Sequence, residues 1–348
     1  MALPTVDTSY LLDFLTGLLN TPSPTGFTAP AIAFTEKHLA GIPGMKVSKN
    51  RKGSLIAEWT GKNSDQPRAL TAHTDTLGAI VKEIKSNGRL KMSQIGGFAW
   101  NAVEGEGCQV YSRNGEVFRG SILFQKSSVH VHGKPVGDLK REDENMEIRL
   151  DVRTSSQNDT RALGIEVGDF VSFDPRVEVV NGFIRSRHLD DKACVACIVA
   201  AVKAISSAGL VPLQKTHILI SNYEEVGHGA AVGIPAETTE LIAVDMGAVG
   251  EGQNSDEFHP SICLKDSGGP YHFELSQRLR DLADRFAIEY KPDVYPFYGS
   301  DGESFWRAGG DVAVALIGPG VDASHNYERT HIDALKATTN WILAYLLH

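Results

Sequence analysis

Continuously apolar, strand-like runs alternate with longer helical patterns in both the N-terminal and the C-terminal part of this 348-residue chain. Runs without polar alternation are typical of strands that are buried on both faces, as in parallel sheets covered by helices. We expect strands near residues 54–59, 68–72, 217–223, 241–245 and 312–317, and helices near 7–19, 29–39, 192–206, 273–290 and 332–347. This alternation predicts an α/β/α domain with a mainly parallel sheet.

Residues 77–178 have a different sequence pattern. Short β-like runs alternate there with Gly, Asn and Asp turns, and no helical pattern of ten residues interrupts them. The runs lie at 79–84, 107–111, 120–124, 128–131, 146–152 and 169–173. Such a pattern is typical of a small all-β barrel or sandwich. We therefore expect one α/β domain built from residues 1–76 and 179–348, with residues 77–178 inserted as a β-barrel-like domain.

The charge balance limits the class of partner. With 34 basic and 43 acidic residues the net charge is −9, which argues against nucleic acid as the main partner because phosphate binding needs a basic surface. No apolar stretch is long enough for a membrane span, and the first residues lack the pattern of a signal peptide. Four cysteines in a chain of this length form no disulfide framework, so we expect a cytoplasmic protein.

Metal-binding residue types follow several of the expected strands. Glu224 and Glu225 come directly after the run at 217–223, and His73 and Asp75 form a His-x-Asp pair after the run at 68–72. Asp245 ends the run at 241–245. Two adjacent acids at a strand end are costly, because like charges raise each other's pKa. A cation that neutralises one acid while the chemistry uses the other would offset this cost, so the pattern favours a metal-dependent hydrolase.

Two more residues extend the pattern along the same expected sheet edge. Asp190 stands just before an alanine-rich helix, whose dipole favours a carboxylate, and His325 comes shortly after the run at 312–317. In open α/β sheets the ligand crevice lies beyond the carboxyl ends of the strands. Each residue alone also has an ordinary structural interpretation, as a helix cap, a hydrogen-bonded pair or a turn residue. Their joint placement at one edge favours a site.

Other residues of similar types have simpler interpretations. Cys194 and Cys197 lie inside the alanine-rich helix, where small buried side chains pack. His130 and His132 share one face of an expected strand in the inserted region, which indicates a surface or interface role. His331 is a rival to His325 as a metal ligand.

The ordered set of motifs resembles the dinuclear-metal aminopeptidases of the glutamyl, deblocking and tetrahedral (TET-type) group, some of which carry the label endoglucanase. The resemblance extends over nearly the whole chain. The segment Gly299–Asp301 is also similar to a family segment near the substrate pocket. The matching motifs are Ser23-Pro24-Thr25-Gly26, His73-Thr74-Asp75, Asp190-Asp191-Lys192, Glu224-Glu225-Val226-Gly227, Val244-Asp245-Met246-Gly247 and Ser324-His325.

The resemblance implies a role for each matching residue. Asp190 would bridge two metal ions, with His73 and Asp245 completing the ligands of one ion. Glu225 and His325 would complete those of the other. This mixed nitrogen and oxygen set suits zinc, with cobalt or manganese as alternatives. A bridging carboxylate can hold two cations about 3.5–4 Å apart, which is the spacing of two-metal hydrolases.

The remaining roles concern catalysis and substrate. Glu224 would be the general base, and Asp75 would orient His73. We expect Asp301, His228 and His188 to contact the substrate. The implied reaction is removal of the N-terminal residue from short, unblocked peptides. The family resemblance also implies a homo-oligomer, either a dimer or a dodecamer built from dimers.

Other functions fit parts of the same pattern. A metal-dependent deacylase or blocked-peptide hydrolase on this scaffold would accept N-acyl substrates. A non-catalytic assembly or binding protein would have kept the fold, although loss of Glu224 or of a ligand would then be expected. A glycosidase can use two carboxylates, but it leaves both histidines and the bridging aspartate without a role.

Overall fold

The computed structural model describes residues 2–348 and divides into two compact units. One unit comprises the chain up to Asp75 and from Arg176 onward, and the other comprises Thr76–Pro175. The first unit is a mixed α/β domain with a mostly parallel central sheet, and the second contains a closed β-barrel. This is the predicted fold class. The insertion expected at residues 77–178 overlaps the second unit along nearly its whole length.

The helices of the first unit begin and end largely where the sequence indicates. Asp7 caps the first of them, because its side chain accepts the backbone N–H of Tyr10 at 3.0 Å. The predicted helices at 29–39 and 332–347 are confirmed without a shift of bounds. The helices are α1 (Thr8–Leu19), α2 (Ala29–Leu39), α6 (Leu189–Ser207), α7 (Phe273–Arg285), α8 (Asp301–Arg307) and α9 (Ile332–Leu347), with short 3₁₀ turns η2 (Glu224–Val226) and η3 (Gly229–Ala231).

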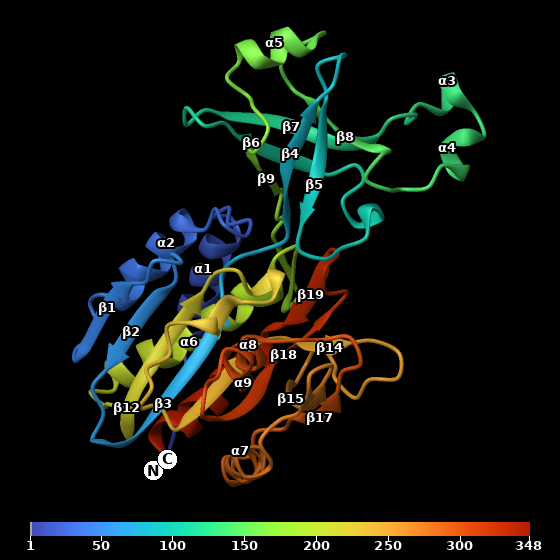
Figure 1. Ribbon diagram of the computed structural model, residues 1–348. Coiled ribbons are helices and arrows are strands. Elements are labelled where there is room, and N and C mark those ends of the chain that lie inside the picture. The colour runs from blue at the N-terminus through green and yellow to red at the C-terminus, as the bar shows by residue number, and fades with distance from the viewer. Residues whose placement is uncertain (1) are drawn as a thin grey trace. The chain divides into compact units, whose positions relative to one another are not determined.

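The central sheet has the strand order β1-β2-β12-β3-β13-β18-β19-β11-β10 (Figure 1). Its middle pairs, β12 with β3, β3 with β13 and β13 with β18, are parallel, so their carboxyl ends meet at one edge. The strands are β1 (Met45–Lys49), β2 (Leu55–Trp59), β3 (Asn63–His73), β10 (Glu178–Val180), β11 (Phe183–Ser186), β12 (Gln214–Ser221), β13 (Glu240–Val244), β14 (Gly247–Val249), β15 (Pro260–Asp266), β16 (Gly269–Pro270), β17 (Lys291–Val294), β18 (Ala313–Asp322) and β19 (Glu328–His331).

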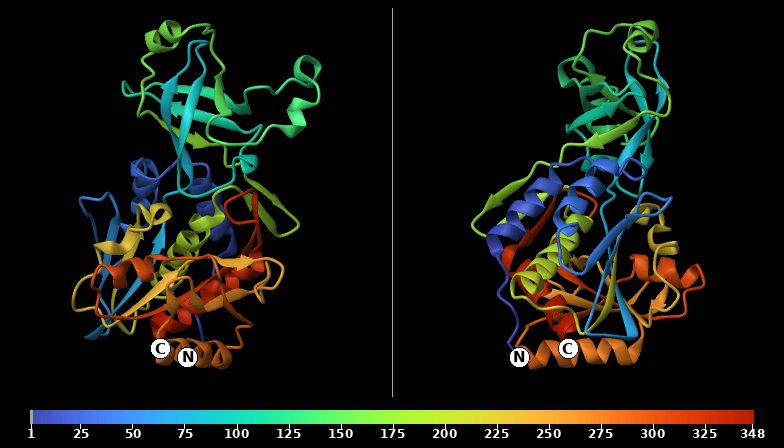
Figure 2. Two further views of the ribbon diagram at one scale, coloured as in Figure 1. Left: turned by 45° about the vertical axis from the view of Figure 1, so that its right-hand side comes forward. Right: turned by 90° about the vertical axis from the view of Figure 1, so that its left-hand side faces the viewer.

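Successive residues of the middle strands enter two different cores. Leu70 and Ile218 belong to the large core that includes α1, α2, α6 and α9. Ala69 and Leu219 belong to a smaller core that includes Phe305 of α8. Because successive strand residues point to opposite faces, helices cover both faces of the sheet. The right-hand view of Figure 2 shows α1, α2, α6 and α9 on one side of these strands and α8 on the other.

The second unit is a closed barrel with its own core. Its strands follow the order β4-β5-β8-β7-β6-β9, and residues such as Val81, Val110 and Ile148 fill the interior. The elements are β4 (Gly78–Ile84), β5 (Leu90–Ile95), η1 (Trp100–Ala102), β6 (Gly107–Tyr111), β7 (Val117–Phe124), α3 (Val129–His132), α4 (Pro135–Asp138), β8 (Met146–Leu150), α5 (Gln157–Ala162) and β9 (Phe170–Phe173).

The structure differs from the expectations in several single elements. The strand expected at 128–131 is wrong, because Val129–His132 forms the short helix α3 and no residue of it is buried. The strand β5 was not expected from the sequence. The helix expected at 273–290 ends at Arg285, because Ala287 takes a φ of 51° and the chain then enters β17.

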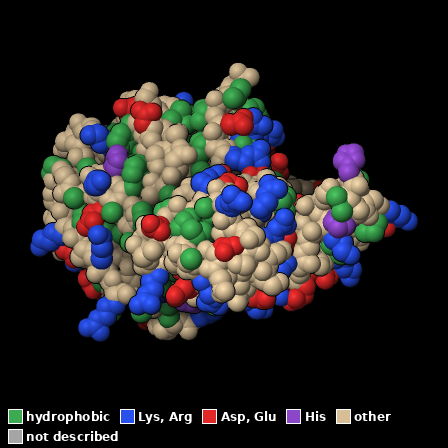
Figure 3. Space-filling view, turned by 90° about the horizontal axis from the view of Figure 1, so that it is seen from above, with side chains coloured by type: hydrophobic (Ala, Val, Ile, Leu, Met, Phe, Trp, Pro, Cys, Tyr) green, Lys and Arg blue, Asp and Glu red, His purple; other side chains and the backbone are tan. Residues whose placement is uncertain are grey.

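Two surface properties bear on partners. None of the helices in residues 2–348 combines the length and the apolar character that crossing a membrane requires. Figure 3 shows Lys and Arg side chains intermingled with Asp and Glu on the face that it draws.

Candidate active site

Three parallel strands bring metal-binding residue types to one edge of the sheet. His73 is the last residue of β3, and Asp245 directly follows β13. Strand β12 ends at Ser221, two residues earlier than expected. The chain then turns through Tyr223, whose φ is 75°, and enters η2 with Glu224 and Glu225. Because β12, β3 and β13 are parallel, these side chains meet at the carboxyl edge of the sheet.

Asp190 and His325 reach the same edge from irregular backbone. Asp190 and Asp191 lie in the first turn of α6 with non-helical dihedral angles, and a cis peptide bond joins them. His325 lies between β18 and β19 and takes a φ of 63°.

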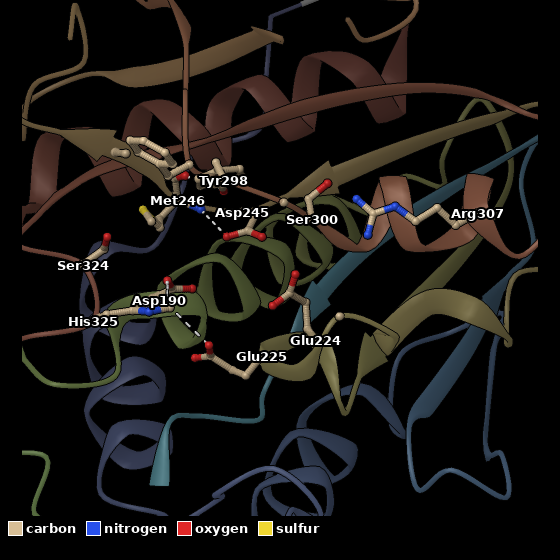
Figure 4. A pocket seen from close by; sticks show the side chains of 14 residues that line it. Asp190, Glu224, Glu225, Asp245, Met246, Tyr298, Ser300, Arg307, Ser324 and His325 are labelled. Carbon is tan, nitrogen blue, oxygen red and sulfur yellow. Dashed lines mark hydrogen bonds and ion pairs between the residues drawn. The ribbon is translucent and has the colours of Figure 1, made fainter. Parts of the chain in front are cut away.

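Asp190 stands between the two imidazoles. Its Oδ1 lies 3.2 Å from His73 Nε2, and its Oδ2 lies 3.4 Å from His325 Nε2. Glu225 Oε2 lies 3.4 Å from His325 Nε2. On the other side, ligand atoms of His73, Asp190 and Asp245 all lie within 4.8 Å of one another. The two oxygens of one carboxylate thus face two neighbouring sets of donors (Figure 4).

Glu224 lies beside the first of these donor sets. Its Oε2 is 3.6 Å from His73 Nε2, and its side chain is 15% exposed, compared with 3% for Glu225. In Figure 4 its carboxylate points toward Asp245 and into the cavity, while the carboxylate of Glu225 points toward His325. The two adjacent acids therefore face different parts of the site.

Asp75 organises the site by two routes. His73 Nδ1 donates to the backbone carbonyl of Asp75 at 2.9 Å, whereas the nearest carboxylate oxygen of Asp75 is 3.7 Å away. A carbonyl oxygen only accepts, so Nδ1 carries a proton. Without a bound ion, Nε2 also carries a proton and donates to Asp190, and loss of that second proton would present the Nε2 lone pair to a cation. The carboxylate of Asp75 accepts the backbone N–H groups of Glu224 and Glu225 at 3.2 and 3.3 Å and the hydroxyl of Thr25 at 2.7 Å.

Glu328 is a site residue that the sequence analysis did not identify. It is buried, and its two oxygens accept the backbone N–H groups of Asp190 and His325, each at 3.1 Å. It thereby joins the two irregular segments that carry these side chains. In the sequence, only its position three residues after His325 indicates that Glu328 belongs to the site. This indication is weak, because it depends on the fold of the loop.

Burial and mutual repulsion raise the proton affinity of the acids. Burial, followed by the charge of Asp190, raises the pKa of Glu225 to about 8 and that of Asp245 to about 7. Burial and then Asp245 raise the pKa of Glu224 well above its usual range. Burial opposes ionisation of Asp190 too, but hydrogen bonds from His325 and His73 hold its pKa below the ordinary value.

This arrangement fits divalent metal ions. Four carboxylates and two imidazoles crowd into one largely buried cluster, where cations would relieve the repulsion between the carboxylates. Oxygen and nitrogen donors together suit zinc, cobalt or manganese. The orientation of His73 through its second nitrogen is also that of a metal-binding imidazole.

A cavity of about 380 Å³ opens beside the cluster. One part of its wall is formed by Asp190, Asp245, Glu224, Glu225 and His325. A loop and the end of α8 form another part (Figure 4). The lining residues are Asp190, Glu224, Glu225, Gly227, Asp245, Met246, Ala248, Phe297, Tyr298, Gly299, Ser300, Arg307, Ser324 and His325.

None of the three residues that were expected to contact the substrate is among the described residues that line this cavity. The buried carboxylate of Asp301 accepts hydrogen bonds from Ser221, from the hydroxyl of Thr71 at 3.1 Å and from the N–H of Ala230 at 2.7 Å. Through these hydrogen bonds Asp301 connects η3 to the carboxyl-terminal parts of β3 and β12.

The other two lie outside the cavity for different reasons. His228 is exposed, and its ring stacks on Tyr223 at 5.3 Å. His188 is buried at the residue before α6. Both flank the site in sequence, but proximity in sequence did not bring either ring to the cavity wall.

The histidines with other interpretations are also placed. His331 precedes α9, and its Nδ1 accepts the N–H of Asp333 at 3.2 Å, so it caps that helix and does not join the cluster. His130 and His132 lie in the exposed helix α3 and not on a strand. Cys194 and Cys197 are buried thiols inside α6.

Comparison with known proteins gives a consistent result. The family model described as M42 glutamyl aminopeptidase matches residues 53–341. The protein named "Putative aminopeptidase YhfE" from Bacillus subtilis (strain 168) is 48% identical over 336 residues, which cover 96% of this chain and 96% of that protein.

Solved structures agree on the fold. An aminopeptidase from the archaeon Desulfurococcus kamchatkensis has a TM-score of 0.87 at 20% identity, covering 97% of this chain and 95% of its own. The Pyrococcus horikoshii TET1 peptidase has a TM-score of 0.82 at 20% identity, covering 97% of this chain and 99% of its own. At this identity the two structures show a shared fold only.

Proposed function

The chain belongs to the M42 glutamyl aminopeptidase family, and we propose that it removes the N-terminal residue from short peptides with the help of two divalent metal ions. It is thus an aminopeptidase of a metallopeptidase family, a hydrolase that acts on peptide bonds. The number of ions, the acting residues and the class of peptide are our proposal.

The observation that carries the proposal is the position of Asp190 between His73 and His325, with one carboxylate oxygen facing each imidazole. We assign Asp190 as the bridging ligand. His73 and Asp245 would complete the ligands of one ion, and Glu225 and His325 those of the other. Zinc is the metal that this donor set suits best, with cobalt or manganese as alternatives. When bound, the ions would supply Lewis-acid activation of the attacking water and of the scissile carbonyl.

Glu224 is the proposed general base. It borders the cavity, its carboxylate is not needed as a ligand, and it is more exposed than Glu225. In this role it takes a proton from the attacking water and delivers that proton to the leaving amine. Asp75 supports the step as a positioning residue, because it holds the N–H groups of both Glu224 and Glu225 and the imidazole of His73.

Glu225 and Glu224 cannot exchange these roles without moving η2. Glu225 Oε2 lies 3.4 Å from His325 Nε2, and only 3% of its side chain is exposed. If Glu225 is the ligand, the carboxylate of Glu224 does not bind a metal ion and remains free to accept a proton. A cation bound by Glu225 would thus offset the repulsion between the two adjacent carboxylates, which otherwise destabilises the fold.

Assembly and location extend the proposal. The TET1 peptidase of the same fold is described as assembling into a tetrahedron or a large octahedral shell, and a TET1 structure is described as a dodecamer. These descriptions support a homo-oligomer here, such as one of twelve copies. The four cysteines are buried free thiols, which supports a reducing cytoplasm. The mixed charges of Figure 3 and the net charge of −9 give no support for nucleic acid as a partner.

The proposal is tested with metal-stripped protein that is reloaded with zinc, cobalt or manganese. The substrates are a free aminoacyl reporter amide and its N-acetylated counterpart, which differ only at the amine. We expect metal-restored cleavage of the free substrate alone. Cleavage of the acetylated substrate would assign a deacylase or blocked-peptide hydrolase instead, and metal binding without any cleavage would point to a binding protein.

A further inference from the structure

The two adjacent acids of the proposed site lie at the tip of a short loop. We call residues 222–229 the acid loop, and its tip is η2 with Glu224 and Glu225. The loop closes on itself, because the N–H of His228 donates to the carbonyl of Tyr223 at 3.1 Å. The rings of these two residues also stack, with their centroids 5.3 Å apart. Opening of this base would therefore move the backbone that carries both acids.

The turn between β1 and β2 lies beside the acid loop. Strand β2 pairs with β12, and Leu55 at the start of β2 is opposite Ile220, two residues before the loop begins. The turn itself, residues 50–54, is closed by two hydrogen bonds between its ends. The N–H of Asn50 donates to the carbonyl of Ser54 at 3.1 Å, and the N–H of Ser54 donates to Asn50 Oδ1 at 3.0 Å. The turn is thus a fixed support next to the loop.

Lys52, in the middle of this turn, contacts both ends of the acid loop. Its backbone carbonyl accepts the side-chain amide of Asn222, where the chain enters the loop, at 3.1 Å. Its Nζ donates to the carbonyl of His228 and, at 2.9 Å, to the carbonyl of Gly229, where the chain leaves the loop. One residue therefore bridges the base of the loop that carries the acids.

The positive charge of Lys52 suits this position. Its Nζ lies 5.6 Å from the centroid of the Tyr223 ring, which is within the range of a cation–π contact. Burial lowers the pKa of Lys52, but the charges of Asp301 and Asp75 act against this effect. An ammonium has three donors and no acceptor, so it can hold two carbonyls at once. A neutral side chain without donors would keep none of these contacts.

The two acids depend on the base of the loop to different degrees. In the loaded protein, Glu225 would be held by its ion as well as by the loop. Glu224, as the general base, would have no ion to fix its carboxylate. Asp75 holds the backbone N–H groups of both residues at 3.2 and 3.3 Å, and Lys52 holds the base from the other side of the loop. Loss of Lys52 would therefore affect the position of Glu224 first.

We infer that Lys52 is a positioning residue for the general base, because it holds together the two ends of the loop that carries Glu224. The inference rests on the proposed function, in which the carboxylate of Glu224 must meet the attacking water. A displacement of a reacting group by about 1 Å can lower the rate about a hundredfold. A contact that prevents such a displacement acts on turnover and not on substrate affinity.

Lys52→Met tests this role, because Met has nearly the length of Lys but neither its charge nor its donors. In metal-loaded protein acting on a free aminoacyl amide, we expect kcat to fall about ten- to a hundredfold. KM should change little, and both ions should stay bound, because the lost contacts are not made to the substrate or to a proposed ligand side chain. Arg51→Met is the matched control. Arg51 is the exposed neighbour in the same turn, so the variant loses the same charge and should keep the wild-type kcat.

Two kinetic outcomes would overturn the inference while leaving the proposed function intact. One is a wild-type kcat in Lys52→Met. The other is a Lys52→Met defect that disappears when the metal concentration is raised, which would assign Lys52 to metal binding.

Hydrogen exchange measured by mass spectrometry separates this inference from failure of the proposed function, because it requires no turnover. The amides of Gly227 and His228 donate to the carbonyls of Glu224 and Tyr223 at 2.7 and 3.1 Å, so their exchange reports opening of the acid loop. We expect both amides to exchange about tenfold faster in Lys52→Met, as for the loss of roughly one hydrogen bond. Arg51→Met should match the wild type. Faster exchange confined to Lys52→Met would support the role of Lys52 even if no substrate were cleaved, and equal exchange in all three proteins would overturn it.

Discussion

Asp190 is held in its position by protein groups alone. His73 Nε2 lies 3.2 Å from one of its oxygens, His325 Nε2 lies 3.4 Å from the other, and its backbone N–H donates to Glu328. These contacts keep the carboxylate ionised despite burial, whereas Glu225 and Asp245 bind protons more readily. The cluster is therefore preorganised around one residue, and its other acids are the groups that cations would have to deprotonate.

The assignment of Glu224 as the base predicts the behaviour of Glu224→Gln. The amide has the shape of the acid but cannot take a proton from water, so kcat should fall by about a hundred- to ten-thousandfold. The variant should still bind its full complement of metal, as measured by elemental analysis after gel filtration. Glu225→Gln is the matched comparison one residue away, and it should lose metal as well as activity. Near-normal turnover in Glu224→Gln would show that another group is the base.

Glu328 predicts a different kind of defect. In Glu328→Gln one of the two backbone N–H groups of Asp190 and His325 loses its acceptor, since an amide nitrogen only donates. We expect a loss of about 1–3 kcal/mol in the free energy of unfolding and about ten- to a hundredfold weaker metal binding.

Denaturant unfolding and competitive metal titration measure these two effects of Glu328→Gln. Glu289→Gln is the control, because Glu289 is exposed and pairs with His259, which is not part of the site. Unchanged metal affinity in Glu328→Gln would remove Glu328 from the account of the site.

At the scale of elements, close packing of one strand sets the position of a ligand. Gly318 lies in β18, and a Cβ there would fall 1.9 Å from the carbonyl oxygen of Asp245. The N–H of Asp245 also donates to Ile317 of the same strand at 3.1 Å. The backbone that carries Asp245 is thus pressed against β18, and a glycine makes that approach feasible.

Gly318→Ala should therefore displace Asp245 and weaken one metal site more than the other. We expect lower affinity for the ion held by His73, Asp190 and Asp245, together with a loss of stability of about 1–3 kcal/mol from overpacking. Calorimetric metal titration resolves the two affinities. Gly250→Ala is the matched control, because nothing lies within 4 Å of its added Cβ. Equal weakening of both sites would contradict this assignment of ligands to ions.

Elements also show what the sequence could and could not predict. Buried strands and capped helices follow from short-range patterns, so α1, α2 and α9 and the convergence of strand ends were predictable. The segment 128–131 was not, because its short β-like pattern carries no signal that distinguishes a strand from one exposed turn of helix. Hydrogen bonds between segments that are far apart in the sequence also could not be predicted. The acceptor role of Glu328 and the inward turn of Asp301 depend on how the loops close.

At the scale of the whole molecule, the buried cluster couples metal binding to stability. The raised pKa values of Glu225, to about 8, and Asp245, to about 7, mean that the folded metal-free chain binds protons more tightly than the unfolded chain. The stability contributed by these groups is fully present below their ordinary pKa values, and it is lost as the pH rises through 7 and 8. Cations would replace the protons and reverse this loss.

We therefore expect the melting temperature of the metal-free protein to fall between pH 5.5 and pH 8.5, and zinc to raise it most at the higher pH. The loss of stability should be on the order of a few kcal/mol, since a tenfold difference in proton affinity between the folded and unfolded chain corresponds to about 1.4 kcal/mol. Thermal unfolding with and without a chelator at both pH values measures it. Asp245→Asn removes one titrating group, so its metal-free melting temperature should depend less on pH. A metal-free melting temperature that rises over this interval would contradict the account.

The assignment of Asp190 as a ligand that bridges two divalent ions is tested most directly by counting the ions that restore activity. Metal-stripped protein is titrated with zinc while ion binding and hydrolysis of a free aminoacyl amide are followed in the same samples. We expect two equivalents to bind per chain, activity to saturate with the second, and Asp190→Asn to weaken the binding of both. Full activity with one equivalent, or two sites that survive Asp190→Asn unchanged, would contradict a centre bridged by this residue.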